Sequence, residues 1–184
     1  MKAILIAIQP KWVELILRGL KTVEIRKRIP HINGPFKVYI YVTSSKFDIT
    51  LCDDLSAASV ILTNKARGKV VGEFICDKTI LYGECGFEAI ARGGSCLTES
   101  EARAYGKEDY LYGLHISELT VYEQPKELNE FEFLCKNGKT DYNTDIYCKG
   151  CRYAYQGTST KEVYCDRTVL TAPQSWFYVR DLAV

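Results

Sequence analysis

The sequence has almost no net charge, two histidines and no long apolar run. Across 184 residues, 24 Lys and Arg stand against 23 Asp and Glu, and the formal net charge of +1 excludes a protein that binds polyanions through a wholly basic surface. No apolar run approaches the ~20 residues that span a bilayer, so we expect no membrane partner. The 47% hydrophobic content excludes an acidic, disordered chain and is enough for one packed domain.

The scarcity of histidine also limits what the eight cysteines can do. A cysteine nucleophile usually needs a histidine nearby, and only His31 and His115 are present. His115 lies in an apolar Leu-His-Ile segment, which is more typical of a packed strand than of a catalytic base. The opening segment lacks the small-residue cleavage site of a signal peptide, so we expect a cytoplasmic protein with reduced thiols.

Short apolar segments interrupted by Pro and Gly predict many short strands. In the segment 22–28, Val23 and Ile25 alternate with Glu24 and Arg26, so one face of that strand is polar. The other strands are expected over 2–8, 36–42, 68–81 and 176–182, and 111–122 is expected to be one strand or a bent pair of strands.

Two short helices are expected among these strands. An apolar stripe at helical spacing predicts a helix over 11–20, which Gly19 can end by adopting a left-handed conformation. A T-x-x-E capping box predicts a second helix over 98–105, whereas the Gly-rich segment 85–96 is expected to be a loop.

Together these elements predict an α+β fold, namely a small, mostly antiparallel β-barrel with short peripheral helices. Residues 135–168 are polar, contain several Cys and Tyr, and interrupt the apolar pattern before the last strand. We therefore expect a barrel built from 1–134 and 169–184, with 135–168 as a Cys-rich insertion.

The corner between the first helix and the next strand concentrates charge. Glu24 and Arg26 lie two residues apart on one strand face, about 6.6 Å along its axis, and Lys21 and Thr22 lie at the start of the same strand. One carboxylate and two cations there can bind a phosphate, a carboxylate or a base edge, or perform acid–base chemistry. The alternative is an ordinary surface ion pair.

The string P-x-W-x-x-x-I-L-x-G-x-K-T-x-E-x-R, from Pro10 to Arg26, resembles the ASCH family, a branch of the PUA-like barrels. The family hallmark is a helix followed by G-x-K-x-x-E-x-R, and Gly19, Lys21, Glu24 and Arg26 fill its positions. The resemblance covers about 1–133 and resumes near 174–181. It implies a PUA-like barrel with a cleft beside the first helix that binds RNA, a nucleotide or a modified nucleoside.

Some relatives are enzymes, so the resemblance also implies an alternative function as a hydrolase. One small bacterial member removes the acetyl group from acetylcytidine with a Lys at the G-x-K position, a Thr three residues later and a distant Glu. Lys21 matches the first, Glu24 stands where that Thr would be, and Glu73 is the match for the distant acid. Another relative was described as a ribonuclease, and in both cases Lys21, Glu24 and Glu73 would be catalytic.

Half of the eight cysteines fall in the insertion with the spacing C-x12-C-x2-C-x13-C. Four thiolates can hold Zn²⁺ in a tetrahedron, and a metal would order a polar loop that cannot bury enough surface to order itself. We predict structural zinc, with free redox thiols and a disulfide as alternatives. The predicted ligands are Cys135, Cys148, Cys151 and Cys165; Cys76 is expected in the core, and no role is assigned to Cys52, Cys85 or Cys96.

Gln174 and Ser175 directly precede Trp176, where the last strand begins. The first two can supply hydrogen bonds at the cleft, and the indole can stack a base for roughly 1–3 kcal/mol, or instead plug the end of the barrel. The 13 tyrosines leave a third alternative, a protein-interaction factor that binds its partner through a Tyr-rich surface, and the resemblance implies a phage origin for such a factor.

Overall fold

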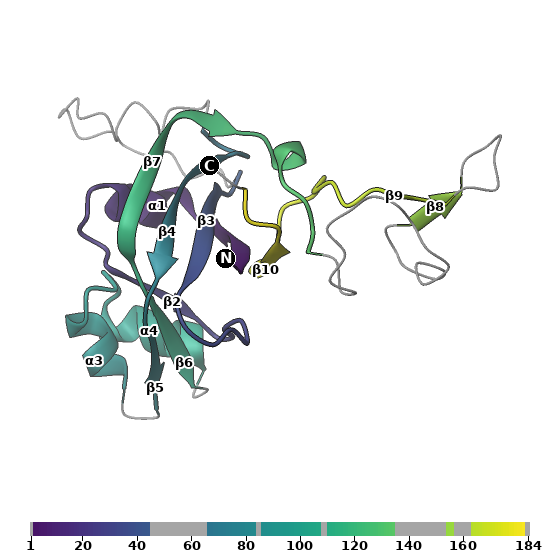
Figure 1. The fold of residues 1–184 in the computed structure, drawn as a ribbon. Coiled ribbons are helices and arrows are strands. Elements are labelled where there is room, and N and C mark those ends of the chain that lie inside the picture. Colours follow the sequence, from purple (N-terminus) through teal and green to yellow (C-terminus); the bar gives the residue numbers. More distant parts are fainter. Residues whose placement is uncertain are drawn as a thin grey trace.

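The computed structural model describes residues 2–44, 66–83, 86–107, 110–134, 154–156 and 163–182 (Figure 1). These residues form an α+β fold of two larger β-sheets and short helices. The helices are α1 (Pro10–Leu17), α3 (Phe87–Arg92) and α4 (Glu99–Gly106), with one 3₁₀ turn, η1 (Leu128–Glu130). No helix in the described ranges is long and apolar enough to cross a membrane.

The larger sheet has the strand order β10-β1-β3-β4-β7. β1 runs parallel to β3, with Ala3 opposite Lys37 and Ile8 opposite Val42, and the other neighbours in this sheet are antiparallel. Its strands are β1 (Ala3–Ile8), β3 (Phe36–Val42), β4 (Val70–Cys76), β7 (Ser117–Lys126) and β10 (Trp176–Val179).

The smaller sheet is antiparallel and has the order β2-β6-β5. Its inner face packs against α3 and α4 through a cluster that includes Val23, Phe87 and Ile90. The strands are β2 (Val23–Arg26), β5 (Thr79–Tyr82) and β6 (Leu111–His115). This sheet matters most for function because β2 carries the charged corner.

One bent segment joins the two sheets: β6 belongs to the smaller sheet and, after Ile116, β7 belongs to the larger one. The Ile116 amide donates to the carbonyl of Thr22 at the bend. Within the described residues the barrel predicted from the sequence is not closed. Closure would need pairing between β10, at the edge of the larger sheet, and β2, at the edge of the smaller one, and no described strand bridges these two edges.

Two local predictions were wrong for physical reasons. The strand predicted over 68–81 is two strands in different sheets, since the chain turns after Cys76 and the His115 amide bonds to the carbonyl of Lys78. The loop predicted over 85–96 contains α3, because Phe87 and Ile90 gain burial by packing on the smaller sheet and this outweighs the local glycine content.

The core lies on both faces of β1, all six residues of which are buried. Ile4, Ile6 and Ile8 pack with Val13 and Ile16 of α1. The alternate side chains Ala3, Leu5 and Ala7 pack on the other face with Tyr39, Tyr41, Phe131, Val169 and Val179. The segment before the last strand therefore completes the core.

A buried polar network lies on the face of the larger sheet that carries Tyr39. The Lys37 ammonium is 3.0 Å from a Glu73 carboxylate oxygen and 3.1 Å from one of Asp181, to which the Tyr39 hydroxyl also donates. Burial opposes charge on Lys37, but the hydrogen bonds to both carboxylates raise its pKa overall. The Tyr122 hydroxyl donates to Glu73 and completes the network.

A pair of strands, β8 (Ala154–Gln156) and β9 (Val163–Cys165), forms a separate antiparallel ribbon that extends away from the two larger sheets (Figure 1). Isolated two-stranded ribbons are marginally stable in water, so this one needs another source of order. Most of the predicted insertion, 135–168, lies outside the described residues.

Candidate functional site

The charged corner forms where α1 ends. Gly19, with φ of +71°, closes the helix, and the amide of Lys21 still bonds back to the carbonyl of Leu15. The next amides, of Thr22 and Val23, bond to the carbonyl of Gly94 in the segment after α3. These bonds fix the start of β2 and direct Lys21 inward.

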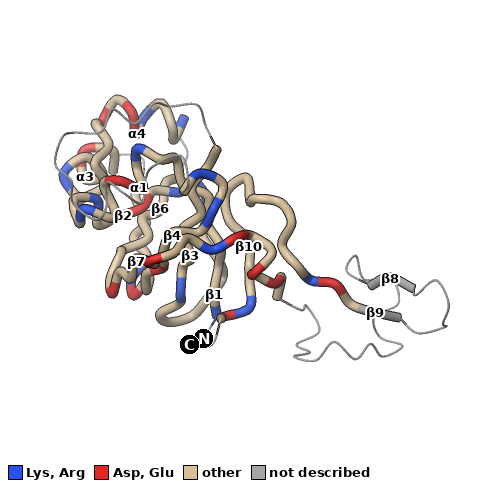
Figure 2. Tube along the Cα trace, turned by 90° about the horizontal axis from the view of Figure 1, so that it is seen from above, with Lys and Arg blue, Asp and Glu red and all other residues tan. Residues whose placement is uncertain are grey.

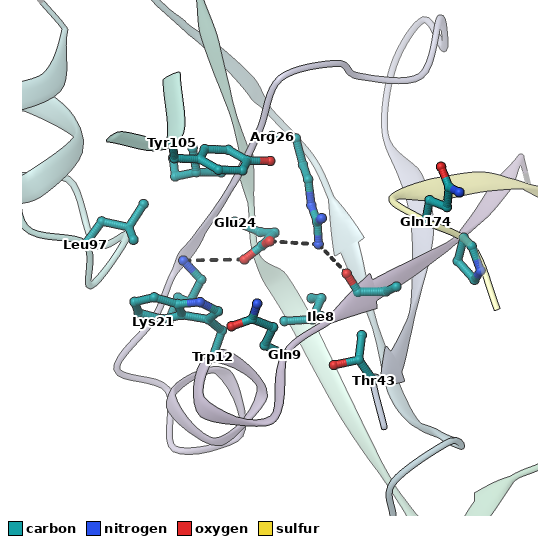
Figure 3. A pocket seen from close by; sticks show the side chains of 13 residues that line it. Ile8, Gln9, Trp12, Lys21, Glu24, Arg26, Thr43, Leu97, Tyr105 and Gln174 are labelled. Carbon is teal, nitrogen blue, oxygen red and sulfur yellow. Dashed lines mark hydrogen bonds and ion pairs between the residues drawn. The ribbon is translucent and has the colours of Figure 1, made fainter. Parts of the chain in front are cut away.

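Lys21, Glu24 and Arg26 form a buried triad (Figure 3). Glu24 lies between the cations, with one oxygen 3.4 Å from the Lys21 ammonium and the other 2.9 Å from the Arg26 guanidinium. Their side chains are only 2%, 7% and 11% exposed, in sequence order. Two cations and one carboxylate give the triad a formal charge of +1, which suits a ligand with negative charge.

Backbone carbonyls hold the two cations in place. The Lys21 ammonium donates to the carbonyl of Ser95 at 2.5 Å, and the Arg26 guanidinium donates to that of Ala7 at 2.7 Å. The Nε of Arg26 is buried with no hydrogen-bond partner among the described residues. Leaving such a donor unsatisfied costs about 1–3 kcal/mol, so an acceptor that reached the Nε would be bound favourably.

The triad lines a cavity of about 280 Å³ beside α1. Figure 3 shows the ring of Trp12 on one side of the triad and that of Tyr105, from α4, on the other. The Lys21 ammonium lies 5.2 Å from the centroid of the Trp12 ring, so a cation–π contact helps to orient it. The remaining lining residues are Ala7, Ile8, Gln9, Ile25, Thr43, Leu97, Pro173 and Gln174.

A second cavity of about 820 Å³ adjoins the first. The two share Tyr105, Pro173 and Gln174, which form the boundary between them. The second cavity is also lined by Lys27, Arg28, Ile29, His31, Tyr112, Ser175, Trp176 and Phe177.

The structure brings together some of the predicted site residues and separates others. Gln174 lines both cavities, whereas Ser175 and Trp176 line only the second. Thr22 is exposed and lines neither cavity. Glu73 is also absent from both cavities, because its carboxylate is engaged by Lys37 and Tyr122 in the network on the larger sheet.

Sequence reasoning missed the aromatic walls of the first cavity. Trp12 belongs to the family-like string but was not among the predicted cleft residues, and it also packs against the core. Tyr105 carried no signal beyond the capping box of its helix. That box is present: the Thr98 hydroxyl accepts from the Glu101 amide, and the Glu101 carboxylate accepts from the Thr98 amide. It predicts α4 correctly, but only tertiary packing places Tyr105 opposite Trp12.

The predicted zinc ligands fall mostly outside this part of the chain. Cys135, Cys148 and Cys151 are not among the described residues, and Cys165 ends β9. Within the described ranges no group of three or more His, Cys, Asp or Glu could hold a metal ion. Cys52 and Cys85 also lie outside them.

Two other cysteines can be placed. Cys76 is buried as predicted, and desolvation raises the pKa of its thiol to about 11, so it is a poor nucleophile near neutral pH. Cys96 is exposed beside the first cavity, between Ser95 and Leu97, and its thiol contacts the carbonyl of Leu20.

Charge elsewhere on the described surface is mixed. Both α3 and α4 carry charges of both signs (Figure 2), including the exposed pairs Glu88–Arg92 and Glu99–Arg103. These two helices therefore present no surface of a single sign.

No family model matches the sequence, and no curated protein matches it. Among solved structures, the crystal structure of ASCH from Zymomonas mobilis is similar, with a TM-score of 0.51 and 17% identity over 97% of this chain and 88% of that one. A single-substitution mutant of the Zymomonas mobilis protein gives a TM-score of 0.52 and 18% identity over 71% and 78%. At such identities the similarity shows a shared fold.

Proposed function

We propose that this chain, which has the fold of an ASCH domain, binds a nucleotide or a modified nucleoside, free or within RNA, in the cavity beside α1. The observation that carries the proposal is the buried triad of Lys21, Glu24 and Arg26 between two aromatic walls. The α+β fold and the resemblance of 10–26 to the G-x-K-x-x-E-x-R element support a PUA-like barrel arrangement as the framework.

The triad offers both kinds of hydrogen-bonding group that a nucleotide needs. Lys21 and Arg26 are donors for phosphate or carbonyl oxygens, and charge-assisted hydrogen bonds of this kind are about twice as strong as neutral ones. Glu24 can accept from an exocyclic amine at a base edge. Because backbone carbonyls hold the two cations and the cations in turn hold Glu24, little side-chain entropy remains to be lost on binding.

The aromatic walls supply the apolar part of the recognition. Trp12 and Tyr105 reach the cavity from different helices, and bases stack on such rings for about 1–3 kcal/mol each. The volume of about 280 Å³ suits a single small ligand. The cavity is therefore matched to one nucleoside unit.

A hydrolase acting on modified nucleosides or RNA remains the second candidate, because Lys21 and Glu24 are close enough to exchange a proton. Binding is favoured over this alternative for two reasons. The Lys21 ammonium already donates to two acceptors, which keeps it in an arrangement suited to holding a ligand. Glu73, the third residue of the predicted catalytic set, lies outside the cavity.

Titration calorimetry with the four nucleoside 5′-monophosphates tests the proposal. Lys21→Met is expected to weaken binding at least tenfold, because it removes the buried donor. Lys11→Met is the matched control: Lys11 also lies over the Trp12 ring, but it is exposed and lines neither cavity.

Tyr105→Ala gives an independent check, since the residue is 39% exposed and we expect the variant to remain folded. We expect about tenfold weaker binding from lost stacking. Absence of binding by the wild-type protein would overturn the proposal, and conversion of a bound ligand that stops in Lys21→Met and Glu24→Gln would favour the hydrolase.

We also propose that 135–168 is an insertion held by one structural zinc ion. In the β8-β9 ribbon Cys165 pairs with Ala154, which follows Cys151 by three residues in the sequence. Three residues span at most about 11 Å, so the sequence limits how far Cys151 can be from Ala154. That proximity supports a shared site, and the ribbon needs such a source of order. Reduced thiolate ligands would suit a cytoplasmic protein.

Metal analysis of the purified protein is expected to give about one zinc per chain, the content of a single tetrahedral site. The double variant Cys148→Ser/Cys151→Ser should lose the zinc. Cys96→Ser should retain it, because Cys96 lies beside the first cavity and is not a predicted zinc ligand. A folded wild-type protein without metal would refute the zinc site.

A further inference from the structure

The second cavity has a charge unlike that of the first. Lys27 and Arg28 line it, and among the described residues no Asp or Glu does. Both side chains are exposed and have no ion-pair partner in the described ranges. Since Lys27 and Arg28 directly follow Arg26, a row of cations leads from the triad into the second cavity.

Two aromatic side chains of the second cavity, Trp176 and Tyr105, are positioned by contacts with neighbouring residues. The Trp176 indole donates to the carbonyl of Arg28 at 3.0 Å and meets the Tyr178 ring edge-on at 5.4 Å. The Lys27 ammonium lies 5.2 Å from the centroid of the Tyr105 ring. Tyr105 therefore borders the first cavity while contacting a cation of the second.

The dimensions indicate a ligand longer than one nucleoside. The second cavity has about 820 Å³, against about 280 Å³ for the first, and the two meet along Tyr105, Pro173 and Gln174. A free mononucleotide would fill only the smaller cavity and would leave the adjoining cations and indole unused.

We propose that the second cavity binds the neighbouring nucleotide of a single-stranded nucleic acid whose recognised nucleoside occupies the first. Lys27 and Arg28 neutralise the connecting phosphates, and the adjacent base stacks on Trp176. Gln174, at the boundary, is placed to bond to the backbone between the two units. This inference rests on the proposed function and specifies its ligand as an oligonucleotide.

Fluorescence anisotropy with a labelled single-stranded RNA hexanucleotide of random sequence, in competition with the four monophosphates, tests the inference. The hexanucleotide is expected to bind at least tenfold more tightly than the monophosphates. Lys27→Ala/Arg28→Ala should weaken hexanucleotide binding at least tenfold and reduce the slope of log affinity against log salt by about 1.4, without affecting monophosphates.

Trp176→Ala should weaken hexanucleotide binding about tenfold, and Trp176→Phe should restore most of it because a stacking face remains. The control Arg92→Ala/Lys126→Ala removes the same charge from residues that line neither cavity, and it should change affinity less than twofold. A DNA hexanucleotide measured in parallel identifies the preferred sugar, and tighter binding of either polymer than of its monophosphates supports the inference.

Two results separate this inference from the function on which it rests. Equal affinity for hexanucleotide and monophosphates, or equal losses in the double variant and its control, would overturn the second subsite alone. Failure of the wild-type protein to bind either ligand would overturn the proposed function as well.

Discussion

Glu24→Ala is expected to lower the free energy of unfolding by about 3–5 kcal/mol, the usual cost of breaking a buried ion pair by removing one partner. Glu24 is the carboxylate that contacts both buried cations, at 3.4 Å and 2.9 Å. Its loss leaves Lys21 and Arg26 with their backbone acceptors but with no opposing charge between them. Urea unfolding at neutral pH measures the difference.

The matched control is Glu88→Ala, which removes the carboxylate of an exposed pair with Arg92 at the start and end of α3. Because both side chains are in water, at 61% and 80% exposure, we expect a loss of no more than about 1 kcal/mol. If the two variants were equally stable, the triad would be solvated in solution and would not be a buried ion-pair cluster.

Gly72→Ala is expected to cost about 2–3 kcal/mol, near the upper end for overpacking. A Cβ at this position of β4 would lie 2.4 Å from the carbonyl oxygen of Thr120 on β7, and backbone cannot rotate away as a side chain can. The pairing of β4 with β7 is irregular on both sides of Gly72, which indicates how closely the strands approach there.

Gly113→Ala, on β6, is the comparison because its Cβ would meet only side chains, those of Val23 and Tyr82. These can shift, so a smaller loss is expected in thermal or urea unfolding. Neither glycine lines a cavity, and the folded fraction of Gly72→Ala should bind nucleotides normally. Reduced affinity at full folding, or a larger loss in Gly113→Ala, would contradict this account.

The part of the site that sequence could predict is the part built from local periodicity. A helix stop at Gly19 and a two-residue repeat in β2 are enough to bring Lys21, Glu24 and Arg26 together. The G-x-K-x-x-E-x-R resemblance points to the same residues, and the fold shared with ASCH from Zymomonas mobilis agrees with it.

The rest depends on pairings between distant segments. The carbonyl that holds Lys21 belongs to Ser95, 74 residues further along the chain, and Tyr105 arrives through the packing of α4. Glu73 was predicted as the distant acid of the same site, yet it does not line the cavity. It lies opposite Tyr39 in the register of β3 and β4, so its side chain joins the Lys37 network and not the triad. Periodicity identifies the two faces of a strand, but not what each face meets.

The pairing of β1 with β10 has a consequence for biosynthesis. Ala3 lies opposite Val179, so during synthesis β1 must wait for a partner strand that is made 176 residues later. Until then that edge of β1 is open, and neither Gln174 nor Trp176 has reached the cavities. Such distant pairing slows folding and exposes a strand edge to aggregation. It also means that a nascent chain acquires the complete binding site only after Gln174 and Trp176 have been synthesised.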